Sequence, residues 1–382
     1  MRKVYFDSAA TTCLRAEVIE KMQEVLADCY GNPSSTHSFG RSSKTLIEKA
    51  RKTIAQQMGA HPSEIIFTSG GTEADNMVLR CAVRDLGVTT IITSKVEHHA
   101  ILHTAMQLQN EYQIKVQYVA LDADGTPSTT HLEELLALDD SKKLVTLMHI
   151  NNEIGNKIDI DRVAEVCKAY DAFFHSDAVQ SIGHWEWDVQ KTKVDFLSAA
   201  AHKFHGPKGV GFAYIRKNTG LKPLIFGGEQ ERGYRAGTES SHNIVGMEEA
   251  FLLAYKHLDE ERAYINELKT YFINKLKAAL PDVFFNGSCA NPDKSTYTLL
   301  NVGIPMSDAK AQLLLFQLDL KGIACSKGSA CQSGSTQGSH VLQAFLPEEQ
   351  LKYPSVRFSF SKYNTKEEID YTIDVLSEYL KD

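Results

Sequence analysis

The chain has 382 residues, more than one ordinary domain holds, so we expect two lobes. Its 41 Lys and Arg residues are outnumbered by 48 Asp and Glu residues, which gives a net charge of −7. A mildly acidic chain without a basic block argues against nucleic acid or an anionic membrane as the main partner. No apolar run approaches the roughly 18 residues of a membrane-spanning helix, and the N-terminus lacks the apolar stretch of a signal peptide.

The cysteines favour a reducing compartment. Their number is odd, their spacing is irregular and no Cys-x-x-Cys pair occurs, which argues against a disulfide framework or a zinc site. We therefore expect the protein to lie in the cytoplasm. The cysteines are Cys13, Cys29, Cys81, Cys167, Cys289, Cys325 and Cys331.

The first two thirds of the chain alternates predicted strands and helices. After an extended segment over residues 1–14, we expect helices over 16–28 and up to about 58. Further helices are predicted over 74–86, from about 99, and over 161–170. The predicted strands span 64–68, 90–93, 115–119, 144–150, 172–175, 194–198 and 209–215. Apolar strands joined by helical crossovers predict an α/β fold with a mostly parallel sheet flanked by helices.

The pattern changes after about residue 237. A helix is predicted over 242–254 and a long charged one over 259–280, followed by shorter strands and helices from 295 to the end. We expect a smaller α+β domain here. The predicted division is a large domain over residues 15–255 and a small domain formed by residues 1–14 and 256–382.

Lys203 has the most unusual setting in the chain. It follows an apolar, small-residue run over 194–201 and precedes a Gly-Pro turn at 206–207. An amine at the end of a buried strand is partly desolvated, loses its proton more easily and can attack a carbonyl. The aldehyde of pyridoxal phosphate (PLP) is the obvious candidate. Alone, however, a lysine is a solvated surface charge in about 95% of cases.

Two further motifs follow predicted strands. The turn 69–73, Ser-Gly-Gly-Thr-Glu, would let backbone N–H groups approach a phosphate at a helix N-terminus, or it is a plain helix cap. It is neither a dinucleotide fingerprint nor a nucleotide-binding P-loop. His98 and His99 lack metal-binding partners at a sensible spacing. His98 is either an imidazole that stacks on a planar cofactor or a solvated loop residue.

Polar residues also end two other strands. Asn151 and Asn152 are either turn formers or ligands of a bound molecule. Asp177 follows a very apolar strand and needs a positive partner, which a pyridinium nitrogen would supply; the alternative is a helix N-cap.

Three later segments complete the set. The loop 232–238 is rich in donors for an anion, or merely exposed. The Gly/Ser-rich run 322–335 holds Cys325 and Cys331, and an exposed thiol there could reach a substrate as a thiolate. Arg357, within an apolar strand-like run, could clamp a carboxylate with two hydrogen bonds or form an internal salt bridge.

Taken in this order, the motifs resemble the cysteine desulfurases of the class V branch of fold-type-I PLP enzymes. The resemblance runs from Tyr-Phe-Asp-Ser-Ala-Ala-Thr-Thr at 5–12 to Glu-Glu-Ile-Asp at 367–370, nearly the whole chain. The spacing from Cys331 to residues 340–342 is similar to that of the long-loop subgroup, which serves iron–sulfur and thiolation pathways. The resemblance implies a large PLP-binding domain and a small domain that carries the mobile loop of Cys331.

The resemblance implies catalytic and substrate-binding roles for five residues. Lys203 would bind PLP as a Schiff base and act as the base at Cα. His98 would stack on the PLP ring and assist proton transfer. Asn152 would lie near the phenolate oxygen of PLP, and Asn152 and Arg357 would bind the carboxylate of the substrate. Cys331 would accept the sulfur.

The other implied residues bind the cofactor. Asp177 would pair with the pyridinium nitrogen and Gln180 would donate to the phenolate oxygen. Thr238 would reach the phosphate of a partner subunit, which implies a homodimer. Ala200 stands where the family usually has a phosphate-binding serine, so one hydroxyl contact is missing. The remaining phosphate ligands would be Gly71, Thr72 and His202.

The implied activity converts L-cysteine to L-alanine and places the sulfur on Cys331 as a persulfide. An acceptor protein for iron–sulfur assembly or tRNA thiolation would receive it. We expect no metal, apart from a transient iron–sulfur cluster on Cys331, and we expect Cys325 to pack. Some relatives dock an iron–sulfur scaffold through a C-terminal extension; because the sequence stops at Asp382, soon after the last predicted helix, we do not expect that docking mode. The alternatives are a selenocysteine lyase, another class V aminotransferase, or an α/β scaffold protein without PLP.

Overall fold

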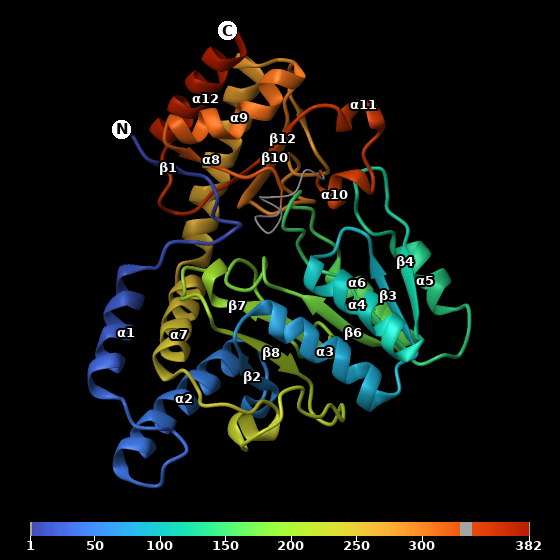
Figure 1. Ribbon diagram of the computed structural model, residues 1–382, viewed down its shortest axis with the longest axis vertical. Helices are drawn as coiled ribbons and strands as arrows, with labels where there is room; N and C mark the ends of the chain where they lie inside the picture. The colour runs from blue at the N-terminus through green and yellow to red at the C-terminus, as the bar shows by residue number, and fades with distance from the viewer. Residues whose placement is uncertain (1, 329–337, 382) are drawn as a thin grey trace.

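The computed structural model describes residues 2–328 and 338–381, which form two lobes, one above the other in Figure 1. The larger lobe is built on a seven-stranded sheet with the order β2-β8-β7-β6-β5-β3-β4. Its neighbouring strands are parallel, except that β8 is antiparallel to both β2 and β7. The predicted α/β fold with a mostly parallel sheet is confirmed. In sheet order the strands are β2 (Ile65–Thr68), β8 (Gly211–Ile215), β7 (Phe196–Ala200), β6 (Phe173–Asp177), β5 (Lys143–Thr146), β3 (Thr90–Ser94) and β4 (Lys115–Val119).

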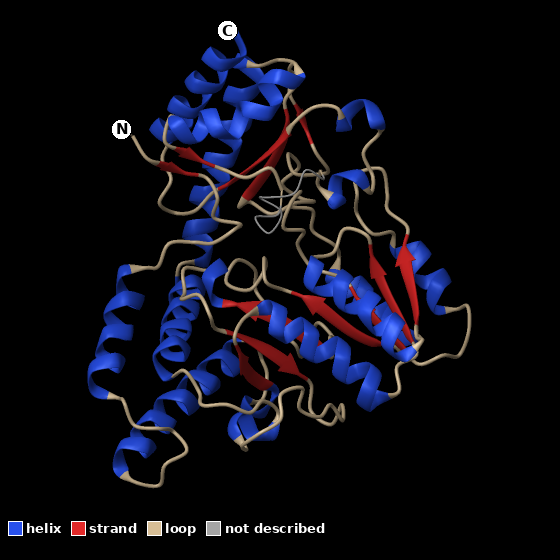
Figure 2. Ribbon diagram, viewed as in Figure 1, coloured by secondary structure: helices blue, strands red, loops and turns tan. Residues whose placement is uncertain are grey.

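Helices cover both faces of this sheet (Figure 2). Side chains alternate between the faces along each strand, so Ile65 and Phe67 enter one core cluster while Ile66 enters the other. The helices α3 (Gly71–Leu86) and α4 (His99–Tyr112) bury the face of Ile66. The opposite face packs against α1 (Ala16–Asp28), α2 (Ser38–Gln57), α5 (Thr129–Leu136), α6 (Ile160–Ala169) and α7 (Ser241–Lys256).

The smaller lobe joins the two ends of the chain. Its strands form an antiparallel sheet with the order β12-β10-β9 and a parallel pair, β1 with β11. Because β1 belongs to the N-terminus, both termini lie in this lobe (Figure 1). Its elements are β1 (Val4–Tyr5), α8 (Leu258–Ala279), β9 (Phe284–Phe285), β10 (Leu299–Gly303), α9 (Asp308–Leu320), β11 (Ile323–Ala324), α10 (His340–Gln343), α11 (Glu348–Leu351), β12 (Ser355–Ser359) and α12 (Lys366–Lys381).

Two local predictions were wrong, and one helix was missed. The helix expected from residue 74 begins at Gly71, so part of the predicted turn is already the first helical turn. The strand expected over 144–150 leaves the ladder to β3 after Val145 and ends at Thr146. The helix α5 was not predicted, although Ser128 caps it and Leu132, Leu135 and Leu136 are buried. Within the described part of the chain, no helix has the length and apolar character needed to span a membrane.

Candidate active site

A cavity of about 200 Å³ opens where β6 and β7 end, at the junction of the two lobes. The carboxyl ends of parallel strands are where open α/β sheets bind ligands. Of the predicted site residues that the structure describes, all except Thr238 line this cavity. The predicted residues in its wall are Gly71, Thr72, His98, Asn152, Asp177, Gln180, Ala200, His202, Lys203 and Arg357.

Lys203 ends a short 3₁₀ turn, Ala201–Lys203, directly after β7. Its Nζ donates to the carbonyl oxygens of Ala9, over 2.6 Å, and of Ala10, over 2.9 Å. Its own carbonyl accepts a hydrogen bond from His184 Nε2 over 3.0 Å. The N-terminal segment therefore binds the lysine amine at the cavity wall, and His184 holds the lysine backbone.

Asp177 is the last residue of β6, buried and 7% exposed. Its Oδ1 accepts from the backbone N–H of Val179 over 2.9 Å, but burial outweighs this bond and raises the pKa of Asp177 to about 6. Asp75 of α3 lies beside it, and ligand atoms of Asp75, Asp177 and His98 fall within 4.8 Å of one another. Burial and the charge of Asp177 raise the pKa of Asp75 well above its usual value. A nearby positive charge would stabilise this pair.

The sequence did not predict the position of Asp75. The carboxylates near His98 come from other elements, Asp75 from α3 and Asp177 from β6. Asp75 is a single carboxylate on the apolar stripe of α3, among Ala74, Met77 and Val78. That break in the stripe was the available signal.

The N-terminus of α3 also lines the cavity. The backbone turns at Gly70, whose φ of 151° favours glycine, and the helix begins at Gly71. The first N–H groups of a helix have no partner within it and carry the positive end of its dipole, so they favour an anion. A Cβ on Gly71 would lie 2.6 Å from Val179 Cγ2, so any other residue here would force Val179 to shift. Ala200 lines the same wall and brings no hydroxyl group.

Both histidines of the cavity are uncharged at neutral pH. Burial lowers the pKa of His98 to about 4, with a further contribution from the charge of Lys203. Burial likewise lowers the pKa of His202 to about 4. His98 caps α4, and its Nδ1 accepts from the N–H of Ala100 over 3.1 Å. Its ring hydrogen is therefore on Nε2.

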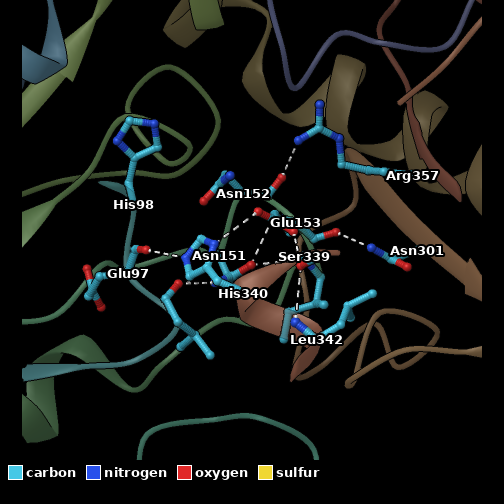
Figure 3. Close-up of polar contacts among 12 residues, drawn as sticks. Glu97, His98, Asn151, Asn152, Glu153, Asn301, Ser339, His340, Leu342 and Arg357 are labelled. Carbon is cyan, nitrogen blue, oxygen red and sulfur yellow. Dashed lines mark hydrogen bonds and ion pairs between the residues drawn. The ribbon is translucent and has the colours of Figure 1, made fainter. Parts of the chain in front are cut away.

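Arg357 of β12 forms the small-lobe wall, and its side chain is 1% exposed. Its Nη1 donates to the carbonyl oxygen of Asn152 over 2.8 Å, as Figure 3 shows, and its Nη2 pairs with Asp7 Oδ1 over 3.0 Å. Gln180 Nε2 donates to the carbonyl oxygen of Ala9 over 3.0 Å. A guanidinium in this position suits the carboxylate of a small substrate.

One predicted residue that the structure describes, Thr238, is not part of this cavity. Thr238 is exposed and lines a separate pocket with Glu231 and Arg235. Cys331 lies outside the described residues. Cys325 packs against the core of the small lobe, as expected, and burial raises the pKa of its thiol.

A network around Glu153 was not predicted (Figure 3). The carboxylate of Glu153 is fully buried, and its Oε2 accepts from Ser339 Oγ over 2.5 Å. Its Oε1 lies 4.0 Å from His340 Nδ1. His340 Nε2 donates to the carbonyl oxygen of Glu97 over 2.9 Å, and Asn301 Nδ2 donates to the carbonyl oxygen of Glu153 over 2.8 Å. The network joins the two lobes one residue away from Asn152.

Comparison with known proteins identifies the family. The sequence model of the class-V aminotransferases matches residues 4–372. The chain belongs to the class-V aminotransferase family. It is 43% identical over 382 residues to the cysteine desulfurase IscS of Dictyoglomus turgidum, across 100% of this chain and 95% of that protein. A solved structure titled "NIFS-LIKE PROTEIN" shares 35% identity with a TM-score of 0.90, and 100% of each chain is covered. A second structure, "SspA in complex with cysteine", shares 31% identity with a TM-score of 0.78, across 95% of this chain and 100% of that one.

Within this family the chain groups with the cysteine desulfurases, as its motifs predicted, and its cofactor is PLP. The residues that line the cavity fit this cofactor, independently of the comparisons. A buried carboxylate, Asp177, stands ready for a pyridinium nitrogen, and the N-terminus of α3 at Gly71 can bind a phosphate. The amine of Lys203 lines the same cavity.

Proposed function

We propose that the chain converts L-cysteine to L-alanine and transfers the sulfur to Cys331 for delivery to an acceptor protein. The main support is one cavity whose wall holds the Lys203 amine, the Asp177 carboxylate and the Arg357 guanidinium, in a chain that groups with cysteine desulfurases.

Each group in the cavity has a role in this proposal. PLP, when bound, stabilises the negative charge that develops at Cα of the substrate. Asp177 keeps the pyridine nitrogen protonated, and Arg357 and Asn152 bind the substrate carboxylate. Lys203 would take the Cα proton, and the uncharged His98 would pack against the cofactor and relay protons.

The sulfur transfer is balanced in atoms and electrons. The Cys331 thiolate attacks the substrate sulfur, so an S–S bond forms and the Cβ–S bond breaks. The electron pair of the broken bond stays with the three-carbon unit, which becomes alanine when it is protonated. The products are alanine and a persulfide on Cys331, and no external oxidant or reductant is needed.

The proposal also covers the oligomeric state, the sulfur acceptor, the compartment and the domain bounds. In the proposed homodimer, the exposed Thr238 contacts the phosphate bound by the other subunit. The acceptor is an iron–sulfur scaffold or a tRNA thiolation protein, and the reducing cytoplasm suits a chain whose described cysteines are all free. The larger domain comprises residues 15–255, and the smaller domain comprises residues 1–14 and 256–382.

The test is a single-turnover incubation with L-cysteine and PLP. Alanine is measured by chromatography, and the persulfide on Cys331 is located by mass spectrometry. We expect about one alanine and one persulfide per active site before an acceptor is added, and neither from Lys203→Ala. The proposal is wrong if the wild-type protein forms no alanine, or if Cys331→Ala releases sulfide from cysteine at the wild-type rate.

A further inference from the structure

Asp75 is a buried carboxyl group that lies close to the cavity but does not line it. It belongs to α3, and only 1% of the residue is exposed. The wall of the cavity is formed by Asp177 instead. Among the described residues, Asp75 Oδ1 has no hydrogen-bond partner. An oxygen buried in this way is costly unless a proton or a positive charge lies beside it.

The described neighbours of Asp75 give it no positively charged partner at neutral pH. Its one ion-pair contact is with His175, whose Nε2 lies 3.6 Å from Asp75 Oδ1. Burial lowers the pKa of His175 to about 3, so this ring is uncharged. The same ring contacts two hydroxyl groups, with Nε2 at 3.0 Å from Ser198 Oγ and Nδ1 at 2.9 Å from Thr146 Oγ1. The other titratable groups around Asp75 are Asp177, Glu97 and His98.

Asp75 and Asp177 form a pair of like charges. Ligand atoms of Asp75, Asp177 and His98 lie within 4.8 Å of one another, and His98 is uncharged at neutral pH. Two carboxylates this close in a buried site cannot both ionise without a cation, so the pair retains a proton. Burial and the charge of Asp177 accordingly raise the pKa of Asp75 well above its usual value. This proton can leave once a positive charge lies beside Asp177.

We propose that Asp75 is a positioning residue that acts through Asp177 on the ring of the cofactor. A ring nitrogen that carries a proton supplies the positive charge that the two carboxylates lack. The pair therefore selects a protonated ring more strongly than Asp177 alone would. On binding, the proton of the carboxyl pair passes to solvent and the ring nitrogen keeps its own. The inference concerns the cofactor and not the sulfur transfer, so it does not rest on the proposed function.

The test compares PLP with its analogue in which a C–H group replaces the ring nitrogen. The analogue keeps the aldehyde and the phosphate but cannot carry the ring proton. Equilibrium dialysis gives the dissociation constants of both compounds for wild-type protein and for Asp75→Asn, each stripped of PLP beforehand. We expect Asp75→Asn to lower the preference for PLP over the analogue roughly ten-fold, the equivalent of about one pKa unit. The affinity for the analogue should stay within about two-fold of wild type.

Proton release gives a second measurement, which also works without a variant. Calorimetry in two buffers of different ionisation enthalpy, at about pH 7, counts the protons that are released when each compound binds. Wild-type protein should release about one proton more per site with PLP than with the analogue. This difference should disappear in Asp75→Asn, because asparagine has no proton to release.

A matched control is Asp374→Asn, which removes an exposed carboxylate of α12 and should change neither measurement. The inference is overturned if Asp75→Asn weakens the binding of both compounds equally, because Asp75 then only maintains the shape of the site. It is equally overturned if the variant keeps the wild-type preference, or if wild-type protein releases no additional proton with PLP. Neither measurement uses L-cysteine or Cys331, so failure of the proposed function would leave these results unchanged.

Discussion

Glu97 is predicted to make the protein less stable as the pH rises. Burial raises the pKa of its fully buried carboxyl group to about 8, despite hydrogen bonds from the N–H of Met148, and its unperturbed value is 4.5. A carboxyl group whose pKa is higher in the folded state than in the unfolded state contributes stability that is fully present below the unfolded pKa. This stability is lost as the pH rises through the folded pKa. Each pH unit between the two values costs about 1.4 kcal/mol, so between pH 6 and pH 9 the loss is about 2.7 kcal/mol.

The assay compares the wild-type protein with Glu97→Gln, which has the same shape and no titration. Urea unfolding at about pH 6 and pH 9 gives the free energy of unfolding of each protein, and the difference between them removes the contribution of every other group. We expect the variant to gain about 2.7 kcal/mol relative to wild type over this range. If the difference between the two proteins is the same at both pH values, Glu97 is ionised throughout, and burial does not control its charge.

Three other changes have definite expected outcomes. Ala200→Ser should tighten PLP binding several-fold, roughly 1 kcal/mol, by supplying the missing hydroxyl group, as measured by equilibrium dialysis; unchanged affinity would mean that another group already fills that position. Gly71→Ala should weaken PLP binding and cost roughly 1–3 kcal/mol of stability, because its Cβ would collide with Val179 Cγ2 at 2.6 Å; a variant that binds PLP like wild type contradicts this. Glu231→Gln breaks a buried pair in which Arg51 Nη1 and Nη2 lie 2.7 and 2.9 Å from the carboxylate, and should cost about 3–5 kcal/mol in urea unfolding; a loss below about 1 kcal/mol would show that the pair is compensated.

Local patterns predicted the residues at strand ends. Asp177 and Ala200 end neighbouring strands, and Lys203 follows three residues after the second. The carboxyl ends of parallel strands meet at one edge of a sheet, so an α/β pattern already brings such residues together. The resemblance to a family then gave each residue a role, which the strand pattern alone could not do.

Contacts between distant segments could not be predicted in this way. Glu153 and Ser339 are 186 positions apart, and nothing near either residue indicates the other. The same holds for Asp75, whose closeness to Asp177 depends on how α3 packs on the sheet. The early start of α3 was missed for a different reason, because glycine is in general a poor helix former. Gly71 occupies the first helical position because a Cβ there would lie 2.6 Å from Val179 Cγ2.

The cavity wall is built from both ends of the chain, and this has a consequence for biosynthesis. The cavity contains Ala9 from the start of the chain and Arg357 from near its end, so it cannot exist until almost the whole polypeptide has left the ribosome. At about 5–20 residues per second, the segment around Ala9 waits roughly 20–70 s for its partners. The large sheet can fold during this interval, whereas the complete cavity forms only once the last strand of the small lobe is in place.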